Sequence, residues 1–169
     1  MARLFGTDGV RGVANRDLDC TLAFQIGAVG AYVLANEVHS PRILIGMDTR
    51  LSGPMLAAAL TAGICSVGGN ALHVGVIPTP AMAYLVRLYE ADAAVMISAS
   101  HNPMEYNGIK WFDGKGFKLS DALEDRMEAL IRSGEALPHP EGRDVGTVID
   151  VPRARQDYCD YLVGKSAGR

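Results

Sequence analysis

Residues 96–103 read MISASHNP and bring two serines, a histidine and an asparagine together at the end of an apolar run. Asn102 and Pro103 account for a turn, but neither turn formation nor packing requires Ser98, Ser100 and His101 to be so close in the chain. A hydroxyl at the exposed end of a buried strand can be positioned to the tolerance that group transfer requires. The cluster therefore predicts a functional site, for which two chemistries of Ser100 compete.

The first chemistry is hydrolysis, with Ser100 as nucleophile and His101 as its base. The strand–turn–helix that presents such a serine needs glycines two residues before and two residues after it, and Ser98 and Asn102 occupy those places. An adjacent Ser–His pair does not by itself make a nucleophile and a general base, because their contact has to be spatial. The pattern argues against a serine hydrolase.

The second chemistry is phosphoryl transfer at Ser100. A phosphoserine carries close to two negative charges, so it needs cations and directed N–H donors around it. The candidates are the side chains of Arg11, Arg50 and Lys110 and the backbone amides of His101 and Asn102.

Each candidate also has a purely structural interpretation. Lys110 lies between Ile109 and Trp111, so it can simply face outward from a strand. The arginines can be ordinary surface cations, and His101 can be a turn residue.

Two other common sites are not supported by the sequence. Residues 163–166, VGKS, resemble the end of a nucleotide-binding P-loop, but Cys159 stands where the earlier glycine is needed. Cys20, Cys65 and Cys159 are scattered and form no C-x-x-C pair. Neither a zinc site nor a disulfide framework is therefore predicted, and a reducing compartment fits best.

The composition limits the possible partners. The 169 residues carry 19 acidic and 16 basic side chains, a formal net charge of -3, and their charges are interspersed without a polybasic stripe. Such a surface does not suit a nucleic-acid backbone. No stretch has the form of a signal peptide or the apolar length of a membrane span. We therefore expect a cytoplasmic protein with no nucleic-acid and no membrane partner.

The apolar spacing predicts helices and strands in alternation. Asp19 can cap a first helix, and the polar residues 36–40 can end it. Its inner face would carry Leu22, Ile26, Val29 and Val33. The later elements are strands at 42–48, 71–76 and 91–98, helices at 55–67 and 79–90, a hairpin at 109–119, and a helix capped by Ser120 or Asp121 and ended by Gly134.

Alternation of this kind indicates an α/β fold, a three-layer α/β/α domain whose sheet is largely parallel. The hairpin, with its Asp113-Gly114 turn, adds an antiparallel pair. We place a domain boundary near residue 150, so that residues 1–150 form the main domain. Residues 151–169 would then be a linker and the start of a second domain, because they are too few to build a core.

Four segments in order resemble the first domain of the α-D-phosphohexomutases. They are FGTDGVRG (5–12), GMDTRLSG (46–53), VGVIPTPA (74–81) and ISASHNPMEYNGIKWF (97–112). Together they are far more specific than any one of them, and the resemblance implies a four-stranded mixed sheet with one antiparallel strand. The opening segment is most similar to the branch of the family that acts on glucosamine phosphates; the branches for mannose or glucose phosphates are the alternatives.

The resemblance implies that Ser100 carries a phosphoryl group in the resting enzyme. The group passes to a hydroxyl of a hexosamine monophosphate, the resulting sugar 1,6-bisphosphate reorients, and the other phosphate returns to the serine. The implied roles are charge stabilisation or acid–base work for Arg11 and Lys110, support of the loop for His101, phosphate contact for Asn102 and Arg50, and a Mg²⁺ ion on the phosphate of Ser100. Glucosamine or glucose 1,6-bisphosphate would be the activator.

The resemblance also implies that the chain is one part of a longer enzyme. The family's metal loop of three aspartates, its sugar-recognition loop and its phosphate-binding loop belong to later domains and do not occur in this sequence. The expected partners are the remaining domains, which would supply the other Mg²⁺ ligands, and a homodimer is a further option. We expect the 169-residue chain alone to be inactive. The alternative of a different class is a stand-alone, non-catalytic phosphosugar-binding module.

Overall fold

Six strands form one mixed sheet in the computed structural model, which describes residues 3–35 and 40–166. Along the chain they are β1 (Val10–Val13), β2 (Arg42–Met47), β3 (Asn70–Val76), β4 (Ala93–Ile97), β5 (Tyr106–Asp113) and β6 (Val148–Asp150). Across the sheet the order is β1-β5-β4-β2-β3-β6, with β5 antiparallel to both of its neighbours and the other pairs parallel. The mixed sheet with one antiparallel strand is confirmed, but the expected number of four strands is wrong.

The two strands that the sequence did not predict are the two edges of the sheet. β1 has four residues in a glycine-rich segment, and β6 has three residues, all exposed, after a loop rich in proline and glycine. Strands this short contain too few alternating positions to give a period-two pattern.

The hairpin expected at 109–119 is present only as a turn closed by one antiparallel bridge, without a second strand. β5 is one continuous strand that lies between β1 and β4, and after its turn the chain forms the isolated bridge of Phe112 with Lys118. The antiparallel partner of β5 is therefore the strand before it in the chain, and the connecting loop contains Ser100.

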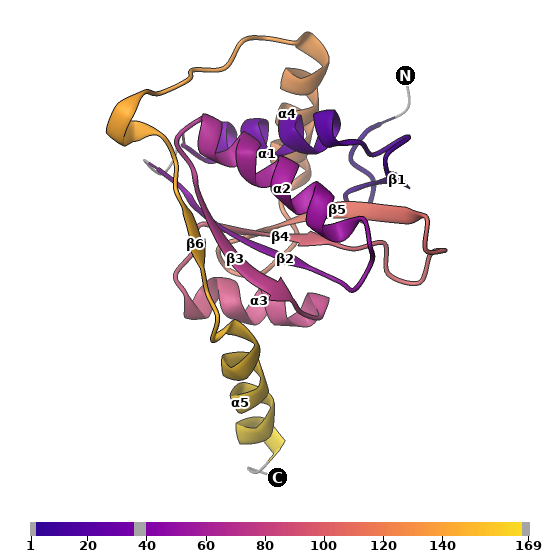
Figure 1. The fold of residues 1–169 in the computed structure, drawn as a ribbon, viewed down its shortest axis with the longest axis vertical. Coiled ribbons are helices and arrows are strands. Elements are labelled where there is room, and N and C mark those ends of the chain that lie inside the picture. Colours follow the sequence, from indigo (N-terminus) through magenta and orange to yellow (C-terminus); the bar gives the residue numbers. More distant parts are fainter. Residues whose placement is uncertain (1–2, 36–39, 167–169) are drawn as a thin grey trace.

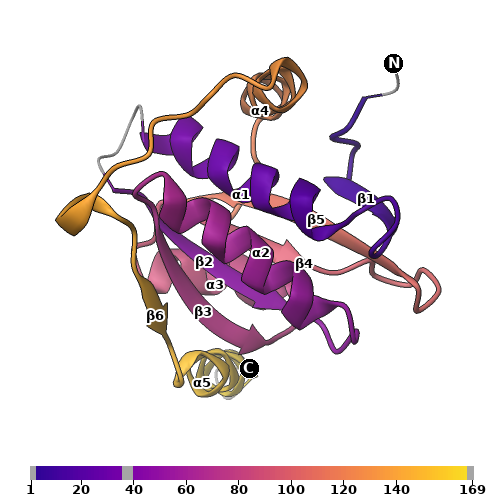
Figure 2. The ribbon, with the colours of Figure 1, turned by 45° about the horizontal axis from the view of Figure 1, so that its top comes forward.

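Helices cover both faces of the sheet (Figure 1). α1 (Cys20–Ala35) and α2 (Gly53–Ser66) lie on one face and α3 (Thr79–Leu88) on the other. α4 (Asp121–Ser133) packs on α1 (Figure 2), and α5 (Ala154–Ser166) follows β6 at the edge of the sheet and extends away from it (Figure 1). The expected three layers are present.

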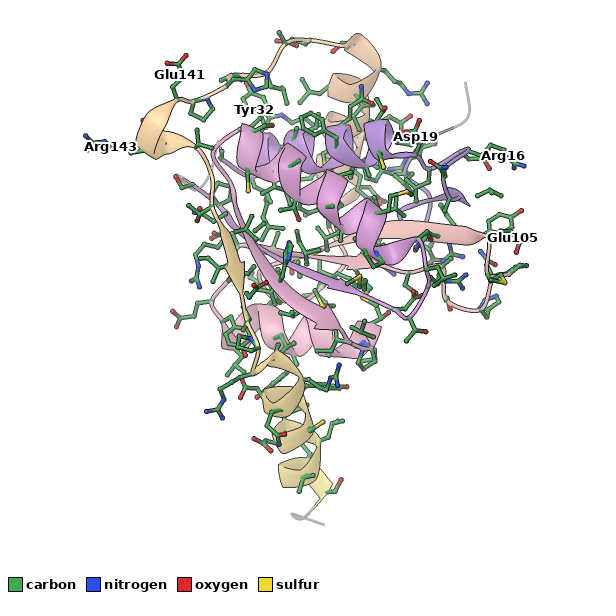
Figure 3. All side chains as sticks on the ribbon, viewed as in Figure 1. Arg16, Asp19, Tyr32, Glu105, Glu141 and Arg143 are labelled. Carbon is green, nitrogen blue, oxygen red and sulfur yellow. The ribbon has the colours of Figure 1, made fainter. Side chains whose placement is uncertain are left out.

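The helix ends follow the predicted caps. Asp19 lies at the first turn of α1 (Figure 3), where its Oδ1 accepts a hydrogen bond of 2.8 Å from the amide of Leu22. Ser120 accepts from the amide of Leu123 at the start of α4, and Gly134 ends that helix with a φ of 64°. The predicted end of the first helix falls largely on residues 36–39, which lie outside the described residues.

The strands alternate between two apolar clusters, one on each face. Ile43, Ile45 and Val95 belong to the cluster under α1 and α2, whereas Leu44 and Met96 belong to the cluster against α3. Burying one such side chain stabilises the fold by about 1.5–3 kcal/mol, so the central strands form a rigid base for the loops at their ends.

The C-terminal segment is attached to the main body by β6 and by aromatic contacts. β6 pairs with β3, and the ring of Tyr161 in α5 stacks on Tyr84 of α3 with 4.0 Å between centroids. The division at residue 150 stays a prediction. Among the described helices, none combines the length and the apolar character needed to cross a membrane.

Glu128 of α4 holds the N-terminal segment that leads into β1. Its Oε2 accepts hydrogen bonds from the amides of Leu4 at 2.8 Å and Phe5 at 3.3 Å, and Arg132 donates to its Oε1. Burial alone would raise the pKa of Glu128, but these hydrogen bonds outweigh it and hold the pKa below the usual value of 4.5. The carboxylate therefore stabilises the folded state in its charged form.

We expect Glu128→Gln to lower the free energy of unfolding at neutral pH by roughly 1–2 kcal/mol, because charge-assisted hydrogen bonds are lost. The folded-state pKa is lowered, so the wild-type advantage is complete above the usual value and disappears as the pH falls through the folded-state pKa. Denaturant unfolding at neutral and acidic pH measures both effects. Asp125→Asn is the control, since its exposed carboxylate pairs only at the surface with Arg3 and should change stability by less than about 0.5 kcal/mol. Equal stability of Glu128→Gln and wild type at neutral pH would contradict this role of Glu128.

Candidate functional site

The chemically interesting residues of the sequence meet at one edge of the sheet. Ser98 and Ser100 follow β4, and Asp48 follows β2. β2 and β4 are parallel neighbours, so their carboxyl ends lie side by side, and the amide of Asp48 donates to the carbonyl of Ile97 at 3.0 Å. α3 begins at the same edge, because it follows the parallel strand β3.

Strand alternation brings two cations to this edge. Lys110 on β5 lies opposite Met96 of β4, and Arg11 on β1 lies opposite Gly108 of β5. Residues two apart on a strand share a face, so both cations lie on the face that α3 covers. The side chain of Lys110 therefore points away from the core under α1, as the structural interpretation expected. It does not point into open solvent, because it lines the site.

These side chains surround a hollow of about 250 Å³ beside Ser100. The residues predicted to be catalytic, Ser100, Arg11, His101 and Lys110, all line it, together with Asp8 and with Thr79 from the first turn of α3. Its volume is below the range of pockets that enclose whole drug-sized ligands, so it suits one charged end of a ligand.

Asp8 is the site residue that the sequence reasoning missed. Its Oδ1 lies 3.5 Å from Nζ of Lys110, and its Oδ2 lies 3.8 Å from the guanidinium of Arg11. One carboxylate thus joins both cations in the position where a phosphoryl group would need them. Asp8 occurs in the quoted segment FGTDGVRG, but only the fold reveals that its neighbours include Lys110.

A tight turn presents Asp8 to the two cations. Gly6 and Gly9 exchange backbone hydrogen bonds of 3.0 and 3.1 Å, which leaves Asp8 at the tip. Gly9 has a φ of 80°, and a Cβ at this position would lie 2.2 Å from the carbonyl oxygen of Ile109. Glycine is required here, because any side chain would push the turn away from β5.

Ser100 lies at the second position of a turn that the amide of Asn102 closes by donating to the carbonyl of Ala99 at 3.1 Å. Its φ is 56°, the left-handed region that residues other than glycine occupy only at an energetic cost. Its Oγ lies 3.3 Å from Nδ1 of His101, so the adjacent pair does make a spatial contact. Among the described residues, no carboxylate pairs with His101, and the third member of a hydrolase triad is missing from that set.

Arg50 and Asp48, which follow β2, hold the loop that contains Ser100. Nε of Arg50 donates to Oδ2 of Asp48 at 3.1 Å, and the backbone amide of Arg50 donates to Oδ1 at 3.0 Å. The four remaining guanidinium N–H groups reach the carbonyl oxygens of Ser100, Asn102, Pro103 and Tyr106 at 2.7 to 3.0 Å.

This arrangement changes the interpretation of Arg50. The resemblance implied a phosphate contact, but all five of its N–H donors are used within the protein, and its side chain is 11% exposed. Arg50 therefore fixes the loop and has no donor left for a phosphate in this conformation.

Asn102 lies in the same loop, but it lines a second hollow, which it shares with Ser100, Asp48, Arg50 and Met104. Its backbone contributes to the loop through the turn hydrogen bond and through its carbonyl group, which Arg50 binds. The structure thus places Asn102 beside the hollow that Arg11 and Lys110 line, and not in the lining of that hollow.

A larger hollow lies elsewhere, at the C-terminal end of β3 and the start of α5. It measures about 670 Å³ and includes His73, Asp150 and Arg155, but none of the residues predicted to react. His73 is held there by Thr61, whose Oγ1 lies 2.8 Å from its Nε2. Volume alone therefore does not locate the chemistry in this domain.

The described residues offer little to a metal ion. Residues 3–35 and 40–166 contain no group of three or more histidine, cysteine, aspartate or glutamate side chains arranged to hold one. Asp48, the carboxylate nearest to the loop backbone, is already engaged by Arg50 and Ser98. The predicted contribution of Ser100, one ligand through an attached phosphate, stays a prediction.

Comparison with known proteins agrees with the geometry. The family model of the phosphoglucomutase/phosphomannomutase α/β/α domain I matches residues 2–137. The phosphoglucosamine mutase of Clostridium acetobutylicum is 59% identical over 162 residues, which cover 95% of this chain and 36% of the relative. That of Ruminiclostridium cellulolyticum is 58% identical over 170 residues, covering 99% of this chain and 38% of the relative. The chain thus spans little more than a third of the length of these curated relatives.

Solved structures show the same fold. A phosphoglucomutase/phosphomannomutase family protein from Burkholderia thailandensis superposes with a TM-score of 0.81 at 25% identity, over 96% of this chain and 35% of that one. The phosphoglucomutase parafusin from Paramecium, at 16% identity and a TM-score of 0.62 over 96% of this chain and 35% of that one, shares the fold.

The position of Asp8 generates a prediction about anion binding. We expect Asp8→Asn to raise the affinity of the hollow for inorganic phosphate about two- to fivefold, because the side chain no longer competes for Arg11 and Lys110. Phosphate titration followed by the NMR shifts of the Ser100 and His101 amides measures it. Glu105→Gln is the matched control: it removes the same charge at the outer tip of the loop between β4 and β5 (Figure 3) and should change the affinity much less. Equal gains in both variants would show a general charge effect and contradict the role of Asp8.

Proposed function

The chain belongs to the phosphoglucomutase/phosphomannomutase family, and from this premise we propose that it is the phosphoserine domain of a phosphoglucosamine mutase. The enzyme interconverts glucosamine 6-phosphate and glucosamine 1-phosphate through a phosphoserine and a sugar 1,6-bisphosphate. The observation that carries the proposal is the hollow in which Ser100, Arg11 and Lys110 meet.

The first step moves the phosphoryl group from Ser100 to the sugar. The bond between phosphorus and Oγ of Ser100 breaks, and a bond between phosphorus and a sugar hydroxyl oxygen forms. The hydroxyl proton leaves to a base as Oγ takes up a proton. After the bisphosphate has reoriented, the same step runs in reverse with the other phosphate, so the serine ends phosphorylated as it began.

Arg11 and Lys110 stabilise the charge on the phosphoryl group in transit. Both side chains are about 70% buried and face the same hollow, so solvent screens their charge less than at an open surface. In the unphosphorylated protein Asp8 occupies this position between them. The arriving phosphoryl group takes over these contacts.

His101 donates a proton to Oγ of Ser100 and takes it back. Its Nδ1 lies 3.3 Å from Oγ, close to hydrogen-bonding range, and a small adjustment brings it within the reach that proton transfer requires. The ring can therefore supply the proton that Oγ gains when the phosphoester breaks, and take it back when the ester forms again. Lys110 is the second candidate for acid–base work at the sugar hydroxyl.

A Mg²⁺ ion would neutralise part of the phosphate charge at Ser100 when bound. This chain would contribute one ligand oxygen, through the phosphate on Ser100, and further ligands would come from other domains. Hexose 1,6-bisphosphates would serve as activators, because they can phosphorylate Ser100 in a protein that has lost its phosphate.

Glucosamine phosphate is the preferred substrate because the relatives at 57–59% identity are phosphoglucosamine mutases. Mannose and glucose phosphates are the alternatives, since a structural neighbour is named for that activity. Comparing kcat/KM for the three sugar phosphates decides between them. A homodimer stays an untested prediction.

Residues 1–169 alone should not complete a turnover. The chain covers only 36% of the length of a relative, and the sugar-recognition loop that the resemblance implies does not occur in its sequence. A coupled assay of the purified 169-residue chain with glucosamine 6-phosphate should give no product above the rate without protein. Sustained conversion would contradict the proposal that turnover needs further domains.

In the full-length enzyme, Ser100→Ala should abolish turnover, with a loss of at least about 10³-fold, because the group that carries the phosphoryl is gone. Thermal unfolding should be almost unchanged, since among the described residues the side chain has one polar contact, with His101. Thr21→Ala removes an exposed hydroxyl on α1, away from the hollows around Ser100, and serves as control. Substantial activity of Ser100→Ala would remove Ser100 as the carrier.

A further inference from the structure

The loop around Ser100 contains a closed ring of hydrogen bonds. The amide of Ser100 donates to Oγ of Ser98 at 3.0 Å, and Oγ of Ser98 donates to Oδ2 of Asp48 at 2.7 Å. The same Oδ2 accepts from Nε of Arg50 at 3.1 Å. Nη2 of Arg50 then donates to the carbonyl oxygen of Ser100 at 3.0 Å, which closes the ring.

The ring fixes both backbone polar groups of Ser100 to one ion pair. With its N–H and its C=O held by side chains from the loops that follow β4 and β2, the peptide groups on either side of Ser100 cannot rotate independently. The φ of 56° lies in a region that serine does not favour. Such a conformation persists only where the surrounding contacts determine it, and the ring supplies these contacts.

Arginine is needed at position 50 for a geometric reason. Four loop carbonyl groups converge on one guanidinium, and they would be unsatisfied and mutually repulsive without it. Lysine offers three donors on a point charge and cannot reproduce a planar group that binds five acceptors.

We propose that Ser98, Asp48 and Arg50 are positioning residues, which hold Ser100 in its left-handed conformation and so aim its Oγ at the hollow of Arg11 and Lys110. The inference rests on the proposed function for its effect on turnover, but not for its effect on the backbone. Phosphoryl transfer depends on alignment, so a shift of about 1 Å in Oγ is expected to cost on the order of 100-fold in rate. None of the three residues needs to touch the substrate for this effect.

Ser98 gives the cleanest test, because its hydroxyl is the link between the amide of Ser100 and Asp48. Ser98→Ala breaks the ring while leaving the ion pair, and Ser98→Thr restores the hydroxyl. Thr21→Ala, which removes an exposed hydroxyl on α1 outside the ring, is the matched control. Arg50→Lys tests the other side of the ring.

The first readout is the backbone of the 169-residue chain. The three-bond coupling between the amide and α protons of Ser100 depends on φ, so it should change in Ser98→Ala and Arg50→Lys. It should keep the wild-type value in Ser98→Thr and Thr21→Ala. This readout needs no enzymatic activity.

The second readout is steady-state kinetics of the full-length enzyme. We expect Ser98→Ala to lower kcat about 10- to 100-fold with KM for the sugar phosphate within about threefold, because alignment and not binding is lost. Ser98→Thr should recover most of kcat, and Thr21→Ala should equal wild type. A general loss of structure would change thermal unfolding and would not be rescued by threonine in this way.

The outcomes separate the two claims. An unchanged coupling in both Ser98→Ala and Arg50→Lys, or a kcat of Ser98→Ala within twofold of wild type, overturns the positioning role. If the coupling changes in these variants but the full-length wild-type protein shows no mutase activity, the ring is supported as a conformational device and the proposed function is overturned instead.

Discussion

The ion pair between Asp48 and Arg50 is the interaction on which the site depends. It lies at the carboxyl end of β2, and through it the loop after β4 is tied to the strand beside it. A loop whose carbonyl groups at Ser100, Asn102, Pro103 and Tyr106 point at one centre needs a planar cation there. The buried apolar strands fix the position of this cation, and the loop takes a shape in which the cation satisfies these four carbonyl groups.

The order of the sheet explains how the chemistry is assembled on that loop. A purely parallel sheet would place only the ends of β2, β3 and β4 at this edge. Because β5 turns back beside β4 and β1 pairs with β5, Lys110 and Arg11 reach the same face as Ser98. Residues from the start of the chain and residues from positions 96–110 thus surround one hollow. The tight turn at Gly9 adds Asp8 between the two cations.

Much of this could be predicted from the sequence, where local signals were strong. The caps at Asp19 and Ser120, the long helices and the central strands follow from periodicity and side-chain chemistry. Ser100 stood out because its neighbours had no structural reason to be there. The edge strands β1 and β6 were missed because they are short, and β5 was misjudged because its partner precedes it in the chain.

The roles of Arg50 and Asp8 could not be predicted, because both depend on partners far away in sequence. Arg50 has the residue type of a phosphate ligand, and only the loop geometry reveals that its donors are already used. Asp8 had no assigned role, since nothing local indicates that it lies 3.5 Å from Lys110. Long-range pairing of this kind is what the sheet order determines and a one-dimensional pattern does not.

The most direct measurement of the central claim is peptide mapping by mass spectrometry of the protein purified from its natural source, across residues 91–110. The account predicts one phosphoryl group, located on Ser100, which is lost on incubation with a sugar monophosphate and regained with a hexose 1,6-bisphosphate. A protein that carries no phosphate there, and accepts none from the bisphosphate, would contradict it.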